Sequence, residues 1–253
     1  MEKRTGVITM GGNPMTLVGK EIKVGDIAPD FTLSKQDLSP YSLSESKGKV
    51  RIISVVPSVD TGVCEFQTKD FNQRASQLEN IQIITVSVDL PFALGRFCAA
   101  NGIDNIVVAS DYKGHDFGLK YGFLIDELQL LARGIVVVDK DDTVRYVEYV
   151  SEVTNHVDYD RAIEEAKKAE EEAKLQAAKT EEENKKAEEN AKLEAAKAEE
   201  EARKAEENAR LEAAKAEEEA RKAEEKARLE AAKAEEEAKL EALKILEKKR
   251  KTN

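Results

Sequence analysis

The chain of 253 residues contains no tryptophan and only two cysteines, Cys64 and Cys98. Two cysteines are too few for the disulfide framework of a small secreted domain, and their scarcity favours a cytoplasmic protein. No stretch approaches the roughly 18 uncharged apolar residues of a membrane span, so none is expected. Charged side chains interrupt the first thirty residues, which argues against a secretory signal.

An excess of basic residues is also missing. The chain has 51 acidic and 40 basic residues, and its formal net charge is −11 at pH 7. A protein that binds mainly the phosphate backbone of a nucleic acid needs a basic surface. The composition therefore argues against a nucleic acid as the principal partner.

Glycine, proline and aromatic residues are absent from the last third of the chain. All 13 glycines lie at or before Gly134, all five prolines at or before Pro91, and every aromatic residue at or before Tyr159. A segment without these residues cannot turn sharply and has little with which to build a core of its own. The composition predicts two domains, residues 1–160 and 161–253.

Residues 1–160 have the pattern of an α/β domain. Runs rich in β-branched residues at 50–56, 81–88 and 133–138 predict buried strands. Apolar residues at helical spacing over 66–78 predict a helix between the first two strands. Strands that alternate with helices are typical of a layered sheet covered by helices.

A β-hairpin is expected at the N-terminus. The two runs at 6–10 and 15–18 flank the sequence Gly-Gly-Asn-Pro at 11–14, which has the composition of a tight turn. This hairpin would precede the α/β domain proper. About 160 residues are enough for one packed core.

Residues 161–253 repeat with a period of 18, as the blocks 192–209 and 210–227 show. Eighteen residues make five helical turns, so each repeat presents the same face. A narrow alanine stripe results, with one leucine per repeat on the opposite side. Glu–Lys and Glu–Arg pairs at i,i+4 favour a continuous helix of about 140 Å that begins after Asp158, a candidate N-cap.

The state of this helix is open at the level of sequence. A solvated single helix and a weak coiled coil with alanine in the core positions both fit the repeat, and disorder with low helicity is the third alternative. The more apolar end offers a local docking point through Leu240, Leu243, Ile245 and Leu246.

The surroundings of Cys64 favour a reactive thiol. This cysteine follows a predicted strand and the loop 57–63 and opens a predicted helix. Backbone N–H groups and the helix dipole favour the thiolate in a first helical turn. Because Glu65 opposes this effect, a nearby cation is needed, and Arg133 is the candidate.

Simpler roles for the cysteines remain open from the residues alone. Both thiols can be small buried hydrophobic groups. Their separation excludes a CxxC pair, and only His115 and His156 are available to complete a zinc site or a Cys-His nucleophile. Neither histidine has the sequence context of a ligand or base, and each fits a surface or turn position better.

Several motifs resemble one family. Pro57-Ser-Val-Asp-Thr-Gly-Val-Cys64 resembles the active-site loop of the bacterial thiol peroxidases, the atypical two-cysteine peroxiredoxins. The segment 92–98, FALGRFC, resembles the helix of that family's resolving cysteine. The segments 12–14, 23–33 and 131–134 also match its pattern. The resemblance covers about residues 5–165 and says nothing of the repetitive helix.

This resemblance implies a thioredoxin-like fold with an added N-terminal hairpin. Cys64 would be the peroxidatic cysteine and Cys98 the resolving cysteine, joined during turnover in a Cys64–Cys98 disulfide. The Thr61 hydroxyl would contact sulfur and peroxide, Arg133 would supply fixed positive charge, and Pro57 would exclude water. No metal or organic cofactor is implied. A hydroperoxide would be the substrate and thioredoxin or a similar protein the reductant, and the chain would form a homodimer.

Further expectations follow from the cysteines and their neighbours. A disulfide needs Cα atoms within about 7 Å, so the Cys64 and Cys98 segments are expected to loosen during turnover. Gly95 and Gly102 lie beside the second cysteine and would ease that change. Four apolar residues are candidates for a substrate rim or for the core: Phe92, Phe97, Leu124 and Leu128.

Two other functions stay possible at this stage. The long helix can be the working part of a spacer or interaction protein, with the globular domain as its anchor. A disulfide oxidoreductase that acts on protein thiols is the third candidate, which the 34-residue separation of the cysteines disfavours.

Overall fold

A computed structural model describes residues 1–250 of the chain, with side chains to residue 246. It divides into two compact units, Met1–Lys179 and Thr180–Asn253, called unit 1 and unit 2 below. Unit 1 extends past residue 160, where the composition of the chain changes.

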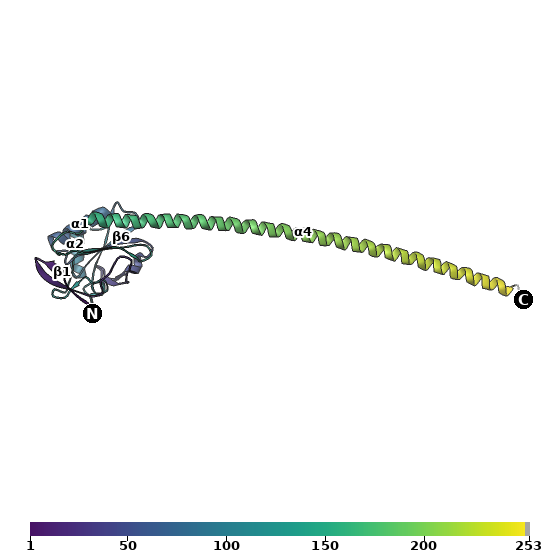
Figure 1. Cartoon of the computed structure of the whole chain (residues 1–253), viewed down its shortest axis with the longest axis horizontal. Helices are drawn as coiled ribbons and strands as arrows, with labels where there is room; N and C mark the ends of the chain where they lie inside the picture. The colour runs from purple at the N-terminus through teal and green to yellow at the C-terminus, as the bar shows by residue number, and fades with distance from the viewer. Residues whose placement is uncertain (251–253) are drawn as a thin grey trace. The chain divides into compact units, whose positions relative to one another are not determined.

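Unit 1 is built on a seven-stranded mixed sheet (Figure 1). Three neighbouring strands run parallel: β5 (Val50–Val55), β6 (Ile81–Ser87) and β7 (Val107–Ser110). The helices α1 (Gly62–Ala75) and α2 (Pro91–Asn101) connect them. Their antiparallel neighbours extend the sheet on both sides. The spatial order is β11 (Val144–Tyr149), β10 (Gly134–Val138), β5 (Val50–Val55), β6 (Ile81–Ser87), β7 (Val107–Ser110), β3 (Thr32–Ser34), β4 (Pro40–Ser42).

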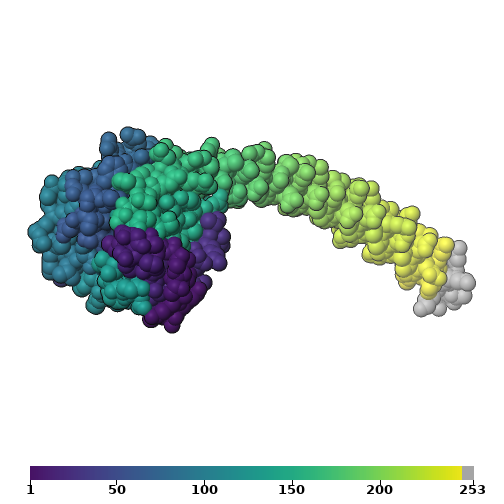
Figure 2. All heavy atoms as spheres, turned by 60° about the vertical axis from the view of Figure 1, so that its left-hand side comes forward, coloured from purple at the N-terminus to yellow at the C-terminus, as the bar shows by residue number. Residues whose placement is uncertain are grey.

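The predicted hairpin is confirmed as β1 (Lys3–Met10) and β2 (Asn13–Val18). It continues through β8 (Leu124–Ile125) and β9 (Leu130–Leu131) into a second, four-stranded sheet. In Figure 2 the hairpin, coloured purple, lies on the surface of unit 1. Two short helices, η1 (Leu43–Ser46) and α3 (Asp116–Lys120), complete the unit.

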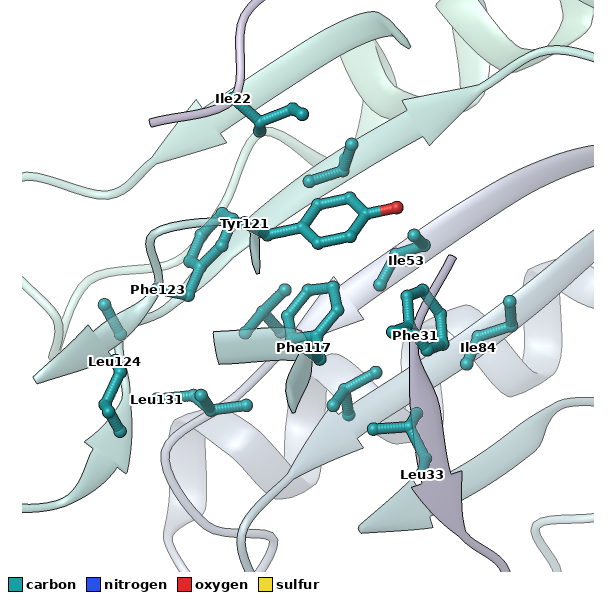
Figure 3. Close-up of a cluster of buried hydrophobic side chains, with 14 of the residues drawn as sticks. Ile22, Phe31, Leu33, Ile53, Ile84, Phe117, Tyr121, Phe123, Leu124 and Leu131 are labelled. Carbon is teal, nitrogen blue, oxygen red and sulfur yellow. The ribbon is translucent and has the colours of Figure 1, made fainter. Parts of the chain in front are cut away.

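Alternation along the strands forms a core on each face of the main sheet. In β5, Val50 and Ile52 belong to one apolar cluster, and Ile53 and Val55 belong to another. The second cluster is rich in aromatic rings, which pack edge-to-face and stacked (Figure 3). Because successive strand residues point to opposite faces, the three predicted strands are buried on both sides, as the β-branched runs indicate.

The helix α4 (Tyr159–Arg250) begins where the sequence predicts. A carboxylate oxygen of Asp158 accepts a hydrogen bond from the backbone N–H of Arg161, which makes Asp158 the N-cap. The inward face of the first turns lies in the core of unit 1 and consists of Ala162, Ile163, Ala166 and Ala169. These turns therefore belong structurally to the globular unit.

In unit 2 the helix is exposed along residues 180–246. Leu193, Leu211 and Leu229 are each more than half exposed, and the alanine stripe is exposed as well. Glu–Lys pairs at i,i+4 are present as predicted, for example Glu200–Lys204 at 2.7 Å. Five more such i,i+4 pairs are Glu181–Lys185, Glu182–Lys186, Glu188–Lys192, Glu218–Lys222 and Glu235–Lys239.

A continuous helix is thus confirmed for this segment, while the choice between a solvated single helix and a weak coiled coil stays a prediction. Although α4 is much longer than a bilayer is thick, none of the helices within residues 1–250 contains a stretch apolar enough to cross a membrane.

Candidate active site

The two cysteines lie on helices that follow parallel strands of the main sheet. Cys64 is the third residue of α1 and is completely buried. Cys98 is near the end of α2 and is 5% exposed. Both are free thiols in the same apolar cluster, which also includes Val59, Leu94 and Phe97.

Two polar groups contact the sulfur of Cys64. The hydroxyl Oγ1 of Thr61 lies 2.9 Å from Sγ, and Nη2 of Arg133 lies 3.2 Å from it. Thr61 is the N-cap residue of α1 in extended conformation, yet its side chain caps no backbone N–H. Its hydroxyl is directed instead at the sulfur, and it also lies 3.3 Å from the carbonyl of Ser58. The site therefore joins Thr61, Cys64 and Arg133 as the sequence predicts.

Strand alternation brings Arg133 to this point. It directly precedes β10, and Ile135 and Val137 face the cluster against which α1 packs. Arg133 has the same parity and points to the same side. The following residue must be small, because a Cβ on Gly134 would lie 2.1 Å from the carbonyl oxygen of Glu148.

The guanidinium of Arg133 is held by three groups and is 2% exposed. Besides the contact to sulfur, Nη1 donates to Oε1 of Gln67 at 2.8 Å, and Nε donates to the carbonyl of Val153 at 2.7 Å. Nε2 of Gln67 in turn donates to Oγ of Ser54 on β5 at 2.9 Å. These contacts fix the plane of the guanidinium against the thiol.

None of the ion pairs among the described residues involves Arg133. Its buried positive charge is met only by the dipoles of an amide and a carbonyl and by the Cys64 sulfur. A buried cation without a carboxylate is costly, and of the three groups that hold the guanidinium only the Cys64 sulfur can carry a negative charge. Glu65, the acidic residue next to Cys64, is paired with Lys69 on the same helix. The arrangement places a thiol beside a fixed positive charge.

Cys98 has a different environment. Burial raises the pKa of its thiol above the ordinary value, and a hydrogen bond with Gln36 opposes this to a lesser degree. The thiol is therefore largely protonated at neutral pH while it stays buried. It becomes an effective nucleophile only when its surroundings change.

Some of the other candidate residues lie near the cysteines, and others lie in the core or on the surface. Pro57 is buried at the start of the loop before α1. Phe97 lies with the cysteines, whereas Leu124 belongs to the aromatic core. Phe92 and Leu128 are 61% and 40% exposed. Only the two exposed residues are therefore available as rim positions.

The histidines lie in a turn and on the surface. His115 has a positive φ of 54° before α3, and the exposed His156 contacts the Tyr159 hydroxyl through Nδ1 at 2.9 Å. Within the described part of the chain, no group of three or more His, Cys, Asp or Glu side chains is arranged to hold a metal ion.

The sequence did not identify two partners of Arg133, Gln67 and the Val153 carbonyl, nor Ser54, which accepts a hydrogen bond from Gln67. A signal was present for Gln67 and Ser54. Gln67 is three residues after Cys64 and so lies on the same helix face, and Ser54 is, with Arg51, one of two polar residues in the buried strand β5. A backbone carbonyl has no sequence signal.

Comparison with known proteins places this site in a class. Residues 23–163 match the Redoxin family model. The solved structure of a peroxiredoxin-like protein from Aquifex aeolicus is similar, with a TM-score of 0.62 and 41% sequence identity, over 66% of this chain and 97% of that one. Fold and site together define a thioredoxin-fold redox protein of the peroxiredoxin type.

Sequence relatives narrow the class. The thiol peroxidase of Halalkalibacterium halodurans is 57% identical over 162 residues, 64% of this chain and 98% of that protein. The thiol peroxidase of Oceanobacillus iheyensis is 58% identical over 62% of this chain and 95% of its own length. The chain belongs to the thiol peroxidases, which are peroxiredoxin-type peroxidases.

Proposed function

We propose that the chain reduces hydroperoxides in two thiol steps. In the first, the Cys64 thiolate attacks the terminal oxygen of the peroxide. The O–O bond breaks, an S–O bond forms, and the leaving alkoxide or hydroxide takes up a proton. The sulfur is oxidised by two electrons to a sulfenic acid, and the peroxide is reduced to an alcohol or water.

The three neighbours of Cys64 have separate tasks in this step. Arg133 stabilises the thiolate and the negative charge that develops on the peroxide oxygens. The Thr61 hydroxyl orients sulfur and substrate through its hydrogen bonds. Buried Pro57 limits water at the sulfur, which protects the sulfenic acid. Gln67 positions Arg133 and does not meet the substrate.

In the second step, the Cys98 thiolate attacks the Cys64 sulfur. An S–S bond forms, the S–O bond breaks, and the oxygen leaves as water after protonation. A dithiol protein such as thioredoxin then reduces the disulfide by exchange. We further propose that the enzyme works as a cytoplasmic homodimer, as the resemblance to the family implies.

A second candidate function belongs to unit 2. The exposed helix along residues 180–246 is favoured as a spacer or docking element, with unit 1 as its enzymatic anchor. The two functions are compatible, because every residue of the proposed mechanism lies in unit 1.

The observation that carries the proposal is the contact of the Cys64 sulfur with a hydroxyl and with a buried guanidinium that lacks a carboxylate partner. The test is peroxide consumption with thioredoxin, thioredoxin reductase and NADPH. We expect Cys64→Ser to abolish the reaction and Cys98→Ser to retain a single turnover. Wild-type consumption no faster than that of Cys64→Ser would refute the proposal, and fast oxidation of protein thiols with slow peroxide reduction would favour a disulfide oxidoreductase.

A further inference from the structure

The carboxylate of Asp89 lies between the segments that carry the two cysteines. Asp89 is in the short connection from β6 to α2, and α2 carries Cys98. Its oxygens accept hydrogen bonds from the loop that precedes Cys64: Ser58 Oγ donates to Oδ1 at 2.7 Å, and the Val59 backbone N–H donates to Oδ2 at 2.8 Å. One carboxylate therefore ties the Cys64 loop to the entrance of the Cys98 helix.

Asp89 is itself held firmly on the sheet side. Ser87 Oγ donates to Oδ2 at 2.8 Å, and Ser110 Oγ donates to the Asp89 carbonyl. Because Ser87 and Ser110 end the parallel strands β6 and β7, the carboxylate has a fixed position relative to the sheet. The Cys64 loop is the more movable partner, since Asp60 and Thr61 are exposed.

A chain of hydrogen bonds leads from Asp89 to the reactive sulfur. Ser58, whose hydroxyl binds Asp89, accepts a hydrogen bond at its carbonyl from the backbone N–H of Thr61 at 3.3 Å. The Thr61 hydroxyl lies 2.9 Å from the Cys64 sulfur. The carboxylate thereby fixes the turn that aims Thr61 at the thiol. A hydrogen bond to an ionised acceptor is stronger than one between neutral groups, so this anchor is the strongest link of the chain.

We propose that Asp89 is a positioning residue that latches the Cys64 loop in the arrangement that reacts with peroxide, and that release of this latch limits formation of the Cys64–Cys98 disulfide. The inference rests on the proposed function. Bonds that exist only before the rearrangement stabilise the starting state, so weaker bonds favour the rearranged state. Asp89 thus speeds the oxidation of Cys64 by peroxide and slows the formation of the Cys64–Cys98 disulfide.

The test is a single turnover of the reduced full chain with hydrogen peroxide, stopped by acid at successive times. Mass spectrometry then separates reduced, sulfenic, disulfide and sulfinic forms. The variant Asp89→Asn keeps the shape of the side chain but loses the charge and one acceptor. We expect disulfide formation to be about tenfold faster and the peroxide step several-fold slower, in proportion to one lost charge-assisted hydrogen bond. Less sulfinic acid should form in excess peroxide.

Two further variants separate the latch from a loss of stability. Asp60→Asn removes the same charge from the Cys64 loop, where the carboxylate makes none of the described contacts with Asp89, and it should behave as wild type. Ser58→Ala breaks only one of the three bonds to the carboxylate and should shift both steps in the same directions by less. It also keeps the proposal testable if Asp89→Asn folds poorly.

The outcomes distinguish this inference from the proposed function. If the wild type forms no Cys64–Cys98 disulfide with peroxide, the proposed function fails. If the disulfide forms but Asp89→Asn and Ser58→Ala leave its rate unchanged or slow both steps alike, the latch is refuted. An acceleration of the second step by Asp60→Asn equal to that by Asp89→Asn would refute it too.

Discussion

Alanine is buried in the first turns of α4 and exposed in the later ones, although the helix is continuous. Ala162, Ala166 and Ala169 are at most 3% exposed in unit 1, whereas the alanines at the same 3–4 spacing along residues 195–209 are exposed. The later part is helical through high propensity and i,i+4 pairs of about 0.2–0.5 kcal/mol each. The spacing of residues therefore determines that this segment is helical, whereas the burial of its alanines depends on whether another element packs against them.

The charged side chains of the two units also differ in burial. Unit 2 sets glutamate and lysine one turn apart on its surface, where such pairs add little. Unit 1 buries the Arg133 guanidinium against a thiol and two dipoles. The proposed reactivity of Cys64 rests on this buried charge, which has no carboxylate partner among the described residues.

Removal of the buried charge should have the largest effect. Arg133→Gln, made in a Cys98→Ser background, is expected to slow oxidation of Cys64 by hydrogen peroxide about 100- to 1000-fold, the usual loss for one electrostatic donor. The variant should fold, because a neutral amide replaces a buried cation that has no carboxylate partner. Arg221→Gln in unit 2 is the matched control. A rate within threefold of the parent would contradict the role of the Arg133 charge.

Enlarging one alanine should separate the buried from the exposed part of α4. Ala166→Leu is expected to lower the free energy of unfolding of unit 1 by about 1–3 kcal/mol, because no space is left beside the sheet. Ala202→Leu should change it by less than about 0.5 kcal/mol. Urea unfolding followed by tyrosine fluorescence measures unit 1 alone, since every tyrosine lies at or before Tyr159. Equal effects of the two substitutions would show that the first turns are not packed as described.

A buried carboxyl in unit 1 should make stability depend on pH. Burial raises the pKa of Asp111 to about 6, although the backbone N–H groups of Phe117 and Gly118 donate to it and act in the opposite direction. Between the ordinary aspartate value near 4 and pH 6, the folded state holds a proton that the unfolded state releases. The contribution of Asp111 is therefore fully present below about pH 4 and is lost as pH rises through 6.

The measurement is the free energy of unfolding at several pH values. Relative to Asp111→Asn, the wild type should lose roughly 1 kcal/mol between pH 5 and pH 7. The comparison with the variant removes the contributions of the other carboxylates. Parallel curves for the two proteins would exclude a raised pKa at Asp111.

Truncation at the boundary between the units should have the smallest effect on catalysis. Deletion of residues 180–253 leaves the buried first turns of α4 intact, and we expect peroxide reduction within about twofold of the full chain. A cut at residue 170 would also remove part of unit 1, including Lys174, which pairs with Glu170. Its effect on catalysis would therefore mix the loss of unit 2 with damage to unit 1. Light scattering of the full chain and of the truncated form tests whether unit 2 mediates self-association. A change in the number of associated copies would establish that it does.

The sequence predicts the main elements of unit 1 because their signals are local. β-branched runs mark β5, β6 and β10, the Gly-Gly-Asn-Pro segment marks the hairpin, and Cys64 falls in the first turn of α1 as expected. Thr61 is also local to Cys64, since the two are three residues apart. The contact of Arg133 with the thiol agrees with the position that strand alternation and the family resemblance indicate.

Long-range contacts of common residue types could not be predicted. Asp89 has no property that separates it from other polar residues until the fold brings Ser58 beside it. The spacing of Gln67 from Cys64 places it on the same helix face, but it does not identify Arg133 as its partner. The burial of the first turns of α4 in unit 1 could not be predicted for a related reason. Alanine suits a buried and an exposed helix face equally well, so the burial of Ala166 depends on the sheet opposite and not on its own sequence.

The central claim is that peroxide oxidises Cys64 and that Cys98 then closes a disulfide with it. Its most direct test is the intact mass of the reduced protein after one equivalent of hydrogen peroxide. The wild type should lose two hydrogen atoms, and Cys98→Ser should gain one oxygen atom, located at Cys64 by a sulfenic-acid trap. An unchanged mass of both proteins, or an oxygen that the trap places on Cys98 in the wild type, would contradict the account.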